Sequence, residues 1–350
     1  MNFASDNVTG AHPAILAALT AANDGPAMPY GNDPLTASVE VRIREVFEAP
    51  RARVLLVGTG TAANALALAA LCPPWGAVYC HRIAHIEEDE CNAPEFFTGG
   101  AKLVHIDGDH AMMDAEALEA RLAGAGAGVV HNVQPAALSL TQATERGGVY
   151  TPEAVARLAS IARARGLGVH LDGTRLANAL AATGASPADM THRAGVDILC
   201  LGATKCGAMA AEAIVLFEPD AHAGRAWELE LRRKRAGHLF SKMRFVAAQM
   251  EGWLADGLWL DLAGHANAMA TRLRQGLAAA GADILTPEGA NLFFARLTAA
   301  QDRALRAAGA HYYAGTADAD GRVEARFVCS FVTTPGEVDA AIAALATQAA

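Results

Sequence analysis

The sequence lacks the signs of a membrane or secreted protein. No apolar run approaches the roughly 20 residues that a membrane-spanning helix needs. The first residues, MNFASDNVTG, show no charged-then-apolar signal pattern, and the six cysteines include no CxxC pair. Because unpaired thiols persist in a reducing compartment, we expect a cytoplasmic protein with no membrane partner.

Positive charge is scarce as well. Lys and Arg number 28 against 37 Asp and Glu, which gives a formal net charge of −9. Neutralising phosphates requires clustered basic residues, so we expect no nucleic-acid partner. The one basic run, RRKR at 232–235, is local and fits either a solvated helix face or a site.

What the sequence does have is a large apolar fraction, 52% of 350 residues, with 33 glycines. This composition is typical of folded α/β proteins of one or two domains. Seven continuous apolar runs indicate strands that are covered on both faces. They are RVLLVG (53–58), GAVYC (76–80), AKLVHI (101–106), GVVHNV (128–133), LGVHLD (167–172), DILCLG (197–202) and EAIVLF (212–217). Helical patterns between them predict right-handed crossovers and a mostly parallel sheet.

From about residue 245 the pattern changes. The helical stretches KMRFVAAQMEGWL and HANAMATRLRQGLAAAG precede two strand candidates, NLFFARL and VEARFVCSF, and a closing alanine-rich helix. We therefore expect a large domain over 1–245 and a smaller C-terminal α+β domain over 246–350. Within the large domain, Thr151 is placed as the N-cap of a helix that begins at Pro152.

Two segments place polar residues where a strand ends. In LLVGTGTAAN, the small residues Thr59, Gly60 and Thr61 lie between a strand and a helix, where backbone N–H groups bind anions. A plain strand-to-helix turn fits this segment equally well. In LGVHLDGTRLANAL, Asp172 ends a buried strand and needs a positive partner, for which an ion pair with Arg175 is the structural alternative.

A third segment, CHRIAHIEEDE at 80–90, combines histidines with acidic residues. It matches no recognised metal-ligand spacing, so we expect no metal. His85 in this segment fits three interpretations: a flat stacking surface, a group that handles a proton, or a buried core histidine.

Lys205 lies among small and apolar residues between two strand candidates, where an ammonium is costly unless it is paired or used in chemistry. The anion loop, Asp172 and Lys205 together indicate pyridoxal phosphate as the cofactor. The lysine forms the Schiff base, the aspartate keeps the pyridine nitrogen protonated, and the loop anchors the phosphate. In this interpretation Lys205 does not bury an ammonium charge, because its amine is bound to the cofactor as an imine.

These segments resemble those of the threonine aldolase family of fold-type-I pyridoxal phosphate enzymes, over nearly the whole chain. The similar stretches are FASDNVTGAHP, YGNDPLT, TGTAAN, AHIEEDE, HLDGTRLANA and RFVCSFVTT. The resemblance implies a mostly parallel seven-stranded sheet between helices, followed by the smaller domain. It also implies a homodimer or homotetramer with sites between subunits, where we place RRKRAGHLFSKMR and PYGND.

The resemblance implies roles for individual residues. The catalytic set is Lys205, His85, Asp172, Glu90 and Glu145. The cofactor-binding set is Thr59, Gly60, Thr61, His85, Asp172, Arg175, Lys205, Lys242 and Arg244. The substrate-binding set is Ser5, Tyr30, Arg175 and Arg326. In these sets His85 stacks on the cofactor ring, Arg175 binds near the phenolate oxygen or the substrate carboxylate, and Arg326, assisted by Ser5, grips that carboxylate.

The chain departs from the family pattern at three places. QATER replaces Glu-Asn-Thr-His-Asn, so Glu145 stands where a histidine often lies near the substrate hydroxyl. FSK replaces a triple glycine and Gly237 replaces a lysine, so we expect Lys242 and Arg244 to make the cross-subunit phosphate contact. TKCG replaces Ser-Lys-Gly. These changes suggest a divergent subgroup that accepts bulky substrates.

The reaction that the resemblance implies is reversible cleavage of L-threonine-type β-hydroxy-α-amino acids to glycine and an aldehyde. His85, Glu90, Glu145 or a water that they hold takes the β-hydroxyl proton. A β-eliminating lyase or a transaminase on the same scaffold is the nearest alternative, because the fold alone does not decide which bond breaks. A non-catalytic pyridoxal-phosphate-binding protein is a further alternative.

Overall fold

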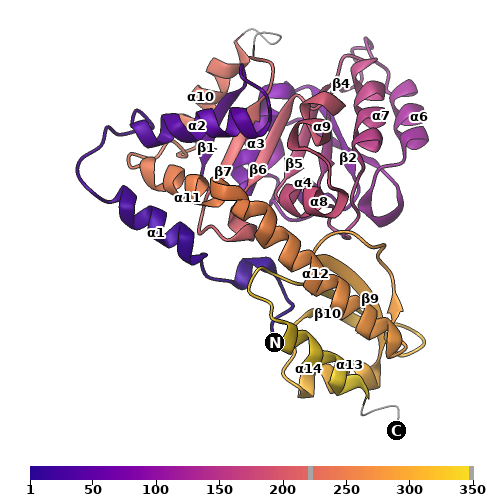
Figure 1. Ribbon diagram of the computed structural model, residues 1–350. Coiled ribbons are helices and arrows are strands. Elements are labelled where there is room, and N and C mark those ends of the chain that lie inside the picture. Colours follow the sequence, from indigo (N-terminus) through magenta and orange to yellow (C-terminus); the bar gives the residue numbers. More distant parts are fainter. Residues whose placement is uncertain (220–223, 347–350) are drawn as a thin grey trace.

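The computed structural model describes residues 1–219 and 224–346. Its larger sheet has seven strands in the order β1-β7-β6-β5-β4-β2-β3, of which β7 runs antiparallel to both neighbours and the others run parallel (Figure 1). The strands are β1 (Arg53–Val57), β2 (Gly76–His81), β3 (Lys102–Ile106), β4 (Gln134–Thr141), β5 (Gly168–Gly173), β6 (Ile198–Gly202) and β7 (Glu212–Leu216). The predicted α/β class and mostly parallel seven-stranded sheet are confirmed.

Helices cover both faces of this sheet, which explains why its strands are continuously apolar. One face carries α3 (Gly60–Leu71), α4 (His85–Glu88), α5 (Ala93–Thr98) and α10 (Arg225–Arg235). The other carries α2 (Pro34–Val46), α6 (Ala115–Ala123), α7 (Pro152–Arg163), α8 (Leu176–Thr183), α9 (Pro187–Met190) and α11 (Arg244–Leu254). The Thr151 side chain accepts a hydrogen bond from the Ala154 N–H at the start of α7, so the predicted N-cap is confirmed.

One strand prediction is wrong. The apolar run at 128–133 is not a strand, and Val130 in it is 91% exposed. Gln134 holds this segment in a turn, because its side chain accepts from the Gly128 N–H and donates to the Val129 carbonyl. The strand β4 begins only at Gln134. An apolar run in the sequence can be an exposed loop, as GVVHNV is, whereas the neighbouring segment PAALSL, with smaller residues, forms the strand.

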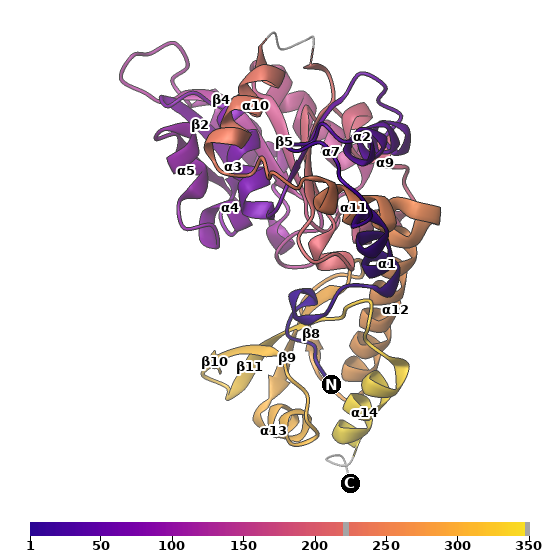
Figure 2. The same cartoon turned by 90° about the vertical axis from the view of Figure 1, so that its left-hand side faces the viewer.

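The C-terminal part forms a second, antiparallel sheet in the order β10-β11-β9-β8 (Figure 2). Its strands are β8 (Asp283–Ile284), β9 (Leu292–Thr298), β10 (Tyr313–Ala317) and β11 (Arg322–Val328), and its helices are α12 (Leu258–Ala279), α13 (Ala299–Ala307) and α14 (Pro335–Ala346). These helices pack on the sheet in a separate apolar cluster, so the predicted C-terminal α+β architecture is confirmed. The division of the chain after residue 245 stays a prediction. Apolar residues of α11 pack in the core of the large sheet.

The N-terminal segment connects the two sheets (Figure 2). Phe3 donates to the carbonyl of His311 and accepts from the N–H of Val328, so the chain begins along the smaller sheet. It continues through a 3-10 helix, η1 (Asp6–Val8), and α1 (Pro13–Ala22). Between them, the His12 N–H donates to the carbonyl of Gly207, two residues beyond Lys205. Among the described helices, none is both long and apolar enough to span a membrane.

Candidate active site

A cavity of about 320 Å³ opens at one edge of the large sheet. The carboxyl ends of β1, β2, β5 and β6 meet there with the amino end of antiparallel β7. Ligands of open α/β sheets bind at this edge, because the loops that follow the strands converge on it. Six predicted site residues line the cavity: Thr59, Gly60, Thr61, His85, Glu90 and Lys205.

Lys205 follows β6 in a one-turn 3-10 helix, η4 (Thr204–Cys206). Its amine borders the cavity and makes no hydrogen bond or ion pair with any residue that the structure describes. Burial lowers the pKa of Lys205 and the positive charge of Arg175 lowers it further, while nearby carboxylates only partly oppose the shift. A lowered pKa favours the neutral, nucleophilic amine that covalent catalysis requires.

Asp172 lies near the end of β5 and is 2% exposed. Its carboxylate accepts hydrogen bonds from Asn64 at 2.9 Å, from the Thr174 N–H at 3.0 Å and from the Thr174 hydroxyl. Burial acts to raise the pKa of Asp172, but the Thr174 hydrogen bonds and the charge of Lys205 outweigh burial and the pKa is lowered. The carboxylate therefore stays charged and is suited to hold a cation.

The loop between β1 and α3 is an open helix N-terminus. Thr59 is the N-cap of α3, and its hydroxyl accepts from the Ala62 N–H at 3.2 Å. The N–H groups of Gly60 and Thr61 border the cavity and have no acceptor within the described chain. A Cβ atom at Gly58 would lie 2.8 Å from the Phe240 ring, so a larger residue there would have to displace this ring. The loop can bind an anion such as a phosphate.

His85 begins α4 and is held by two carboxylates. Its Nδ1 lies 2.8 Å from Glu90 Oε1, and its backbone N–H donates to Glu145 at 2.7 Å. The hydrogen bond with Glu90 raises the pKa of His85 more than burial lowers it. Nδ1 is therefore occupied, and the ring faces the cavity with its other atoms. This position fits a stacking or proton-handling role better than the alternative of a core histidine.

Glu90 and Asp172 are joined by one amide. The Asn64 nitrogen donates to Glu90 at 2.8 Å and to Asp172 at 2.9 Å. Burial raises the pKa of Glu90, and the Asp172 charge adds to this shift. His85, Glu90 and Asp172 bring three ligand-type atoms within 4.8 Å of one another, but hydrogen bonding accounts for this arrangement without an ion.

Glu145 lies in the loop after β4. One of its oxygens accepts from His85, and the other is buried without a hydrogen-bond partner among the described residues. Burial raises the pKa of Glu145 to about 7. The Glu145 side chain does not line the cavity, and it adjoins the cavity through the backbone N–H of His85.

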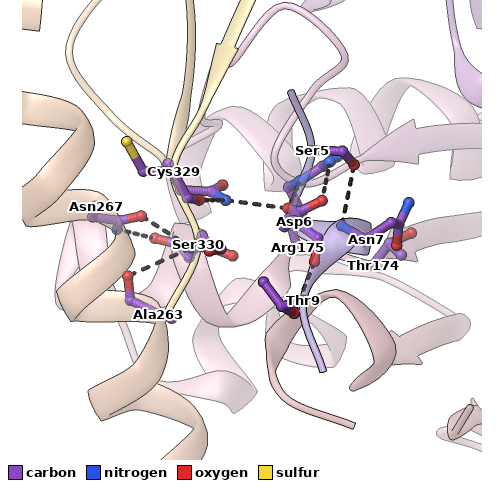
Figure 3. Close-up of polar contacts among 12 residues, drawn as sticks. Ser5, Asp6, Asn7, Thr9, Thr174, Arg175, Ala263, Asn267, Cys329 and Ser330 are labelled. Atoms are coloured by element: carbon purple, nitrogen blue, oxygen red, sulfur yellow. Dashed lines mark hydrogen bonds and ion pairs between the residues drawn. The ribbon is translucent and has the colours of Figure 1, made fainter. Parts of the chain in front are cut away.

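Arg175 pairs with Asp6 and not with Asp172, so the alternative of a structural Asp172–Arg175 ion pair is wrong. Its Nε and one NH2 group donate to the two Asp6 oxygens at 2.7 and 2.9 Å (Figure 3). Both side chains are buried, 10% and 1% exposed. Asp172 is thereby left to interact with Lys205 and with a ligand.

Arg326 and Ser5 lie near this ion pair, because the charges of Arg175 and Asp6 act on Arg326 and Ser5 directly precedes Asp6. Arg326 projects from β11 and donates to the Ala4 carbonyl at 3.4 Å, but it has no carboxylate partner within the described chain. Burial and the charge of Arg175 lower the pKa of Arg326. The Ser5 hydroxyl accepts from the Asn7 N–H at 3.1 Å beside Asp6 (Figure 3). An unpaired, half-buried guanidinium is suited to bind an anion, which argues against the exposed edge-strand alternative.

Among the residues that the structure describes, three further predicted site residues, Tyr30, Lys242 and Arg244, neither line this cavity nor contact the site groups described above. Tyr30 is 44% exposed, and the Lys234 ammonium lies 4.6 Å from the centre of its ring. Lys242 is exposed, and Arg244 donates to the carbonyl of Gly25. The RRKR run lies at the end of α10 and is only partly solvated, because Arg233 is buried and pairs with Glu230.

Several residues of the site were not predicted from the sequence, among them Asp6, Asn64, Thr174 and Glu212. Asn64 is a polar residue in the otherwise apolar helix GTAANALALAAL, and Glu212 is a carboxylate at the start of an apolar strand. Burial raises the pKa of Glu212 to about 7. Burying either side chain without a hydrogen-bond partner costs free energy. An isolated polar residue in an apolar helix or strand could therefore have indicated a site.

These groups fit pyridoxal phosphate. The unpartnered amine of Lys205 lines the cavity. The charged and buried carboxylate of Asp172 adjoins the cavity through hydrogen bonds to the lining residues Asn64 and Thr174. The free N–H groups of Gly60 and Thr61 line the cavity at the helix end. The amine, the carboxylate and the N–H groups match, in order, the aldehyde, the ring nitrogen and the phosphate of that cofactor.

Comparison with known proteins agrees with this interpretation. The sequence model of the beta-eliminating lyase family matches residues 2–300. The chain is 40% identical over 332 residues to the low specificity L-threonine aldolase of Pseudomonas aeruginosa, which covers 95% of this chain and 93% of the relative. It is 38% identical over 337 residues to the protein of the same name from Pseudomonas sp. strain NCIMB 10558, with 96% and 94% covered.

Solved structures show the same relationship. Leishmania major threonine aldolase superposes with a TM-score of 0.92 at 29% identity, over 100% of this chain and 99% of that one. Serine palmitoyltransferase of Sphingomonas wittichii has a TM-score of 0.72 at 16% identity, over 99% and 86% of the two chains, and shares the fold alone. The chain belongs to the beta-eliminating lyase family and, within it, to the threonine aldolases.

Proposed function

We propose that this protein cleaves L-threonine and related β-hydroxy-α-amino acids reversibly to glycine and an aldehyde, with pyridoxal phosphate as cofactor. The proposal depends mainly on the position of Lys205. Its unpartnered amine lies in the same cavity as the open N-terminus of α3 and within electrostatic reach of Asp172. The names of the two Pseudomonas relatives support this reaction. Membership in the family supports a lyase.

When bound, the cofactor supplies an electron-withdrawing ring that stabilises the charge left on Cα as the Cα–Cβ bond breaks. Lys205 provides the amine that holds the cofactor. Asp172 provides the fixed negative charge opposite the ring nitrogen, and the N–H groups of Gly60 and Thr61, with the Thr59 hydroxyl, bind the phosphate. The His85 ring provides a flat surface against the cofactor.

The substrate carboxylate is the group that Arg326 recognises, with Ser5 beside it and Arg175 near the carboxylate or the phenolate oxygen. A guanidinium donates two parallel hydrogen bonds to a carboxylate and so fixes its direction. Holding the carboxylate in this way aligns the Cα–Cβ bond for cleavage.

The β-hydroxyl proton passes to the acid–base group formed by His85, Glu90 and Glu145, directly or through a water. His85 and Glu90 line the cavity, and Glu145 holds the His85 backbone. Glu90 contacts the His85 imidazole and Glu145 contacts the His85 backbone N–H. Because both carboxylates have raised pKa values, this group can take up and return a proton near neutral pH.

The active assembly is a homodimer or homotetramer in the cytoplasm. Tyr30, Lys242 and Arg244 serve the cavity of a neighbouring subunit, which explains why none of them lines the cavity of its own chain. Exposed apolar residues of α10, Trp227 and Leu231, lie beside RRKR and support burial of this region between subunits. The large and small domains divide after residue 245.

The experiment is incubation of the cofactor-loaded protein with L-threonine. Release of acetaldehyde and glycine in equal amounts supports the proposal. The name of the family favours a second candidate, β-elimination, which releases ammonia and a keto acid. A visible chromophore without any product would identify a protein that binds the cofactor without catalysis. A panel of bulky β-hydroxy amino acids tests the predicted substrate range.

A further inference from the structure

Asp6 forms the most deeply buried ion pair of the site. Its two oxygens accept from Nε and one NH2 group of Arg175 at 2.7 and 2.9 Å, and the carboxylate is 1% exposed. Burial acts to raise the pKa of Asp6, but the charge and the hydrogen bonds of Arg175 outweigh it and the pKa is lowered. Asp6 is therefore a fixed negative charge beside the cavity.

The same carboxylate is tied to the smaller sheet. Asn291, directly before β9, donates to Asp6 at 3.1 Å and to the Cys329 carbonyl at 2.7 Å. Figure 3 shows Asp6 in the N-terminal segment between Arg175 and the chain around Cys329. Since Arg326 lies on β11, three residues before Cys329, Asp6 connects Arg175 with the element that carries Arg326.

The Asp6–Arg175 ion pair affects the other charged groups of the site. Two cations lie within electrostatic reach of Arg175: it lowers the pKa of both Lys205 and Arg326, whereas Asp6 opposes the shift in each. Asp172 and Glu145 also lie within reach of Arg175 and are the carboxylates to which it would turn if Asp6 were neutral. Pairing with Asp172 would take its charge away from the cofactor nitrogen.

We propose that Asp6 is a positioning residue of the active site: it holds one edge of Arg175, keeps that guanidinium off Asp172, and sets its place relative to Arg326. The inference rests on the proposed function and deepens it. One arginine of the site is neutralised and fixed by the N-terminal segment, and the other stays unpaired for the substrate carboxylate. Ser5 and Asn7 are held in the same segment by their own hydrogen bond.

The test compares Asp6→Asn with Asp197→Asn in the cofactor-loaded protein. Asp197 is also buried and pairs with an arginine, Arg163, but it lies at the other end of the strands. The substitution at Asp197 should lower the melting temperature and leave the site unchanged. Asp6→Asn should raise KM for a β-hydroxy amino acid by about tenfold or more, with a smaller change in kcat.

A second readout needs no turnover. The visible absorbance of the cofactor on Lys205 titrates with pH, and the groups facing Lys205 are Arg175, Asp6, Asp172 and Glu212. Removing the negative charge of Asp6 leaves Arg175 unopposed, so the midpoint should fall by about one pH unit or more. Asp6→Glu should have a midpoint close to that of the wild type, because it keeps the negative charge.

An unchanged KM and titration midpoint in Asp6→Asn would overturn the inference, and so would equal changes in Asp197→Asn. If Asp6→Asn does not fold, Asn291→Ala carries the test, because it removes the tie to the smaller sheet but leaves the ion pair. It should raise KM without moving the midpoint, and an unchanged KM would contradict the positioning role. If the wild-type protein releases no aldehyde, the proposed function fails, whereas the titration still tests Asp6.

Discussion

The amide nitrogen of Asn64 donates to the carboxylate of Asp172 over 2.9 Å, although the two residues lie 108 positions apart in the chain. The same nitrogen donates to Glu90, so one side chain from α3 links the carboxylate that we propose for the cofactor nitrogen to the carboxylate that contacts the His85 ring. In the proposed function, this buried amide joins the residue that holds the cofactor ring to the residues that handle the proton.

Replacing Asn64 with Ala should weaken cofactor binding. The substitution leaves two buried carboxylates without their shared donor, and each lost hydrogen bond to a charged group costs about 1–3 kcal/mol. We expect the cofactor dissociation constant, measured by absorbance, to rise by at least tenfold. Asn267→Ala removes a comparable buried amide pair, with Asn178, and serves as the control. Equal cofactor affinity in wild type and Asn64→Ala would contradict the link.

Replacing Arg326 with Ala should reduce kcat/KM and leave the bound cofactor intact. Loss of charge-assisted hydrogen bonds worth about 1.5–3 kcal/mol corresponds to a roughly 10- to 150-fold loss. Arg326→Lys should recover only part, because an ammonium lacks the planar fork. Arg322→Ala, on the same strand, is the control. The assignment fails if Arg326→Ala catalyses like wild type or if the cofactor spectrum is lost with the activity.

Glu145 should make stability depend on pH. Its pKa in the folded protein is about 7, above the ordinary value of 4.5, so the folded state binds the proton more tightly than the unfolded state. Between about pH 4.5 and 7 the unfolded state therefore binds fewer protons, and the contribution of Glu145 to stability falls as pH rises through this window. Above pH 7 the full cost remains, roughly 1–3 kcal/mol.

Glu145→Gln removes this titration while keeping an acceptor for His85. The variant should gain stability relative to wild type as pH rises from 5 to 8, measured as the difference between the two melting temperatures. The same substitution should abolish any limb near pH 7 in the kcat/KM profile. Glu153→Gln, at an exposed carboxylate, is the control. A temperature difference that stays constant over this range would show that Glu145 is charged throughout.

Tyr30 should act in the site of another subunit. Tyr30→Ala and Lys205→Ala homo-oligomers should each have little activity. Mixed oligomers, formed by refolding the two variants together, contain some sites with both residues intact and should regain activity. Failure of every mixture to exceed the separate variants, while sedimentation shows mixed oligomers, would place Tyr30 outside the neighbouring site.

The sequence predicted those parts of the fold that depend on local pattern. Six of the seven strands in the large sheet lie where continuous apolar runs were found, because strands covered on both faces have no polar alternation. The fourth strand was misplaced because Val129 and Val130 are apolar but exposed, and because Gln134 closes a turn whose side-chain contacts no pattern reveals.

The site was predicted where one segment holds both the strand end and the functional residue, as with Lys205, Asp172 and the Gly60 loop. It was not predicted where a contact joins distant segments. Asp6 meets Arg175 across 169 positions, so the sequence offered the neighbour Asp172 as a partner instead. Such contacts depend on how the N-terminal segment crosses the two sheets, and periodicity contains no information about that path.

Lys205 is the residue that we expect to carry the cofactor. This can be measured directly, because the chain has only four lysines: Lys102, Lys205, Lys234 and Lys242. Reducing the cofactor-loaded protein with borohydride fixes the cofactor on whichever lysine holds it, and peptide mass spectrometry locates the added mass. We predict one phosphopyridoxyl group per chain on Lys205, with loss of the visible absorbance in Lys205→Ala. Modification of another lysine in place of Lys205, or none at all, would contradict the account.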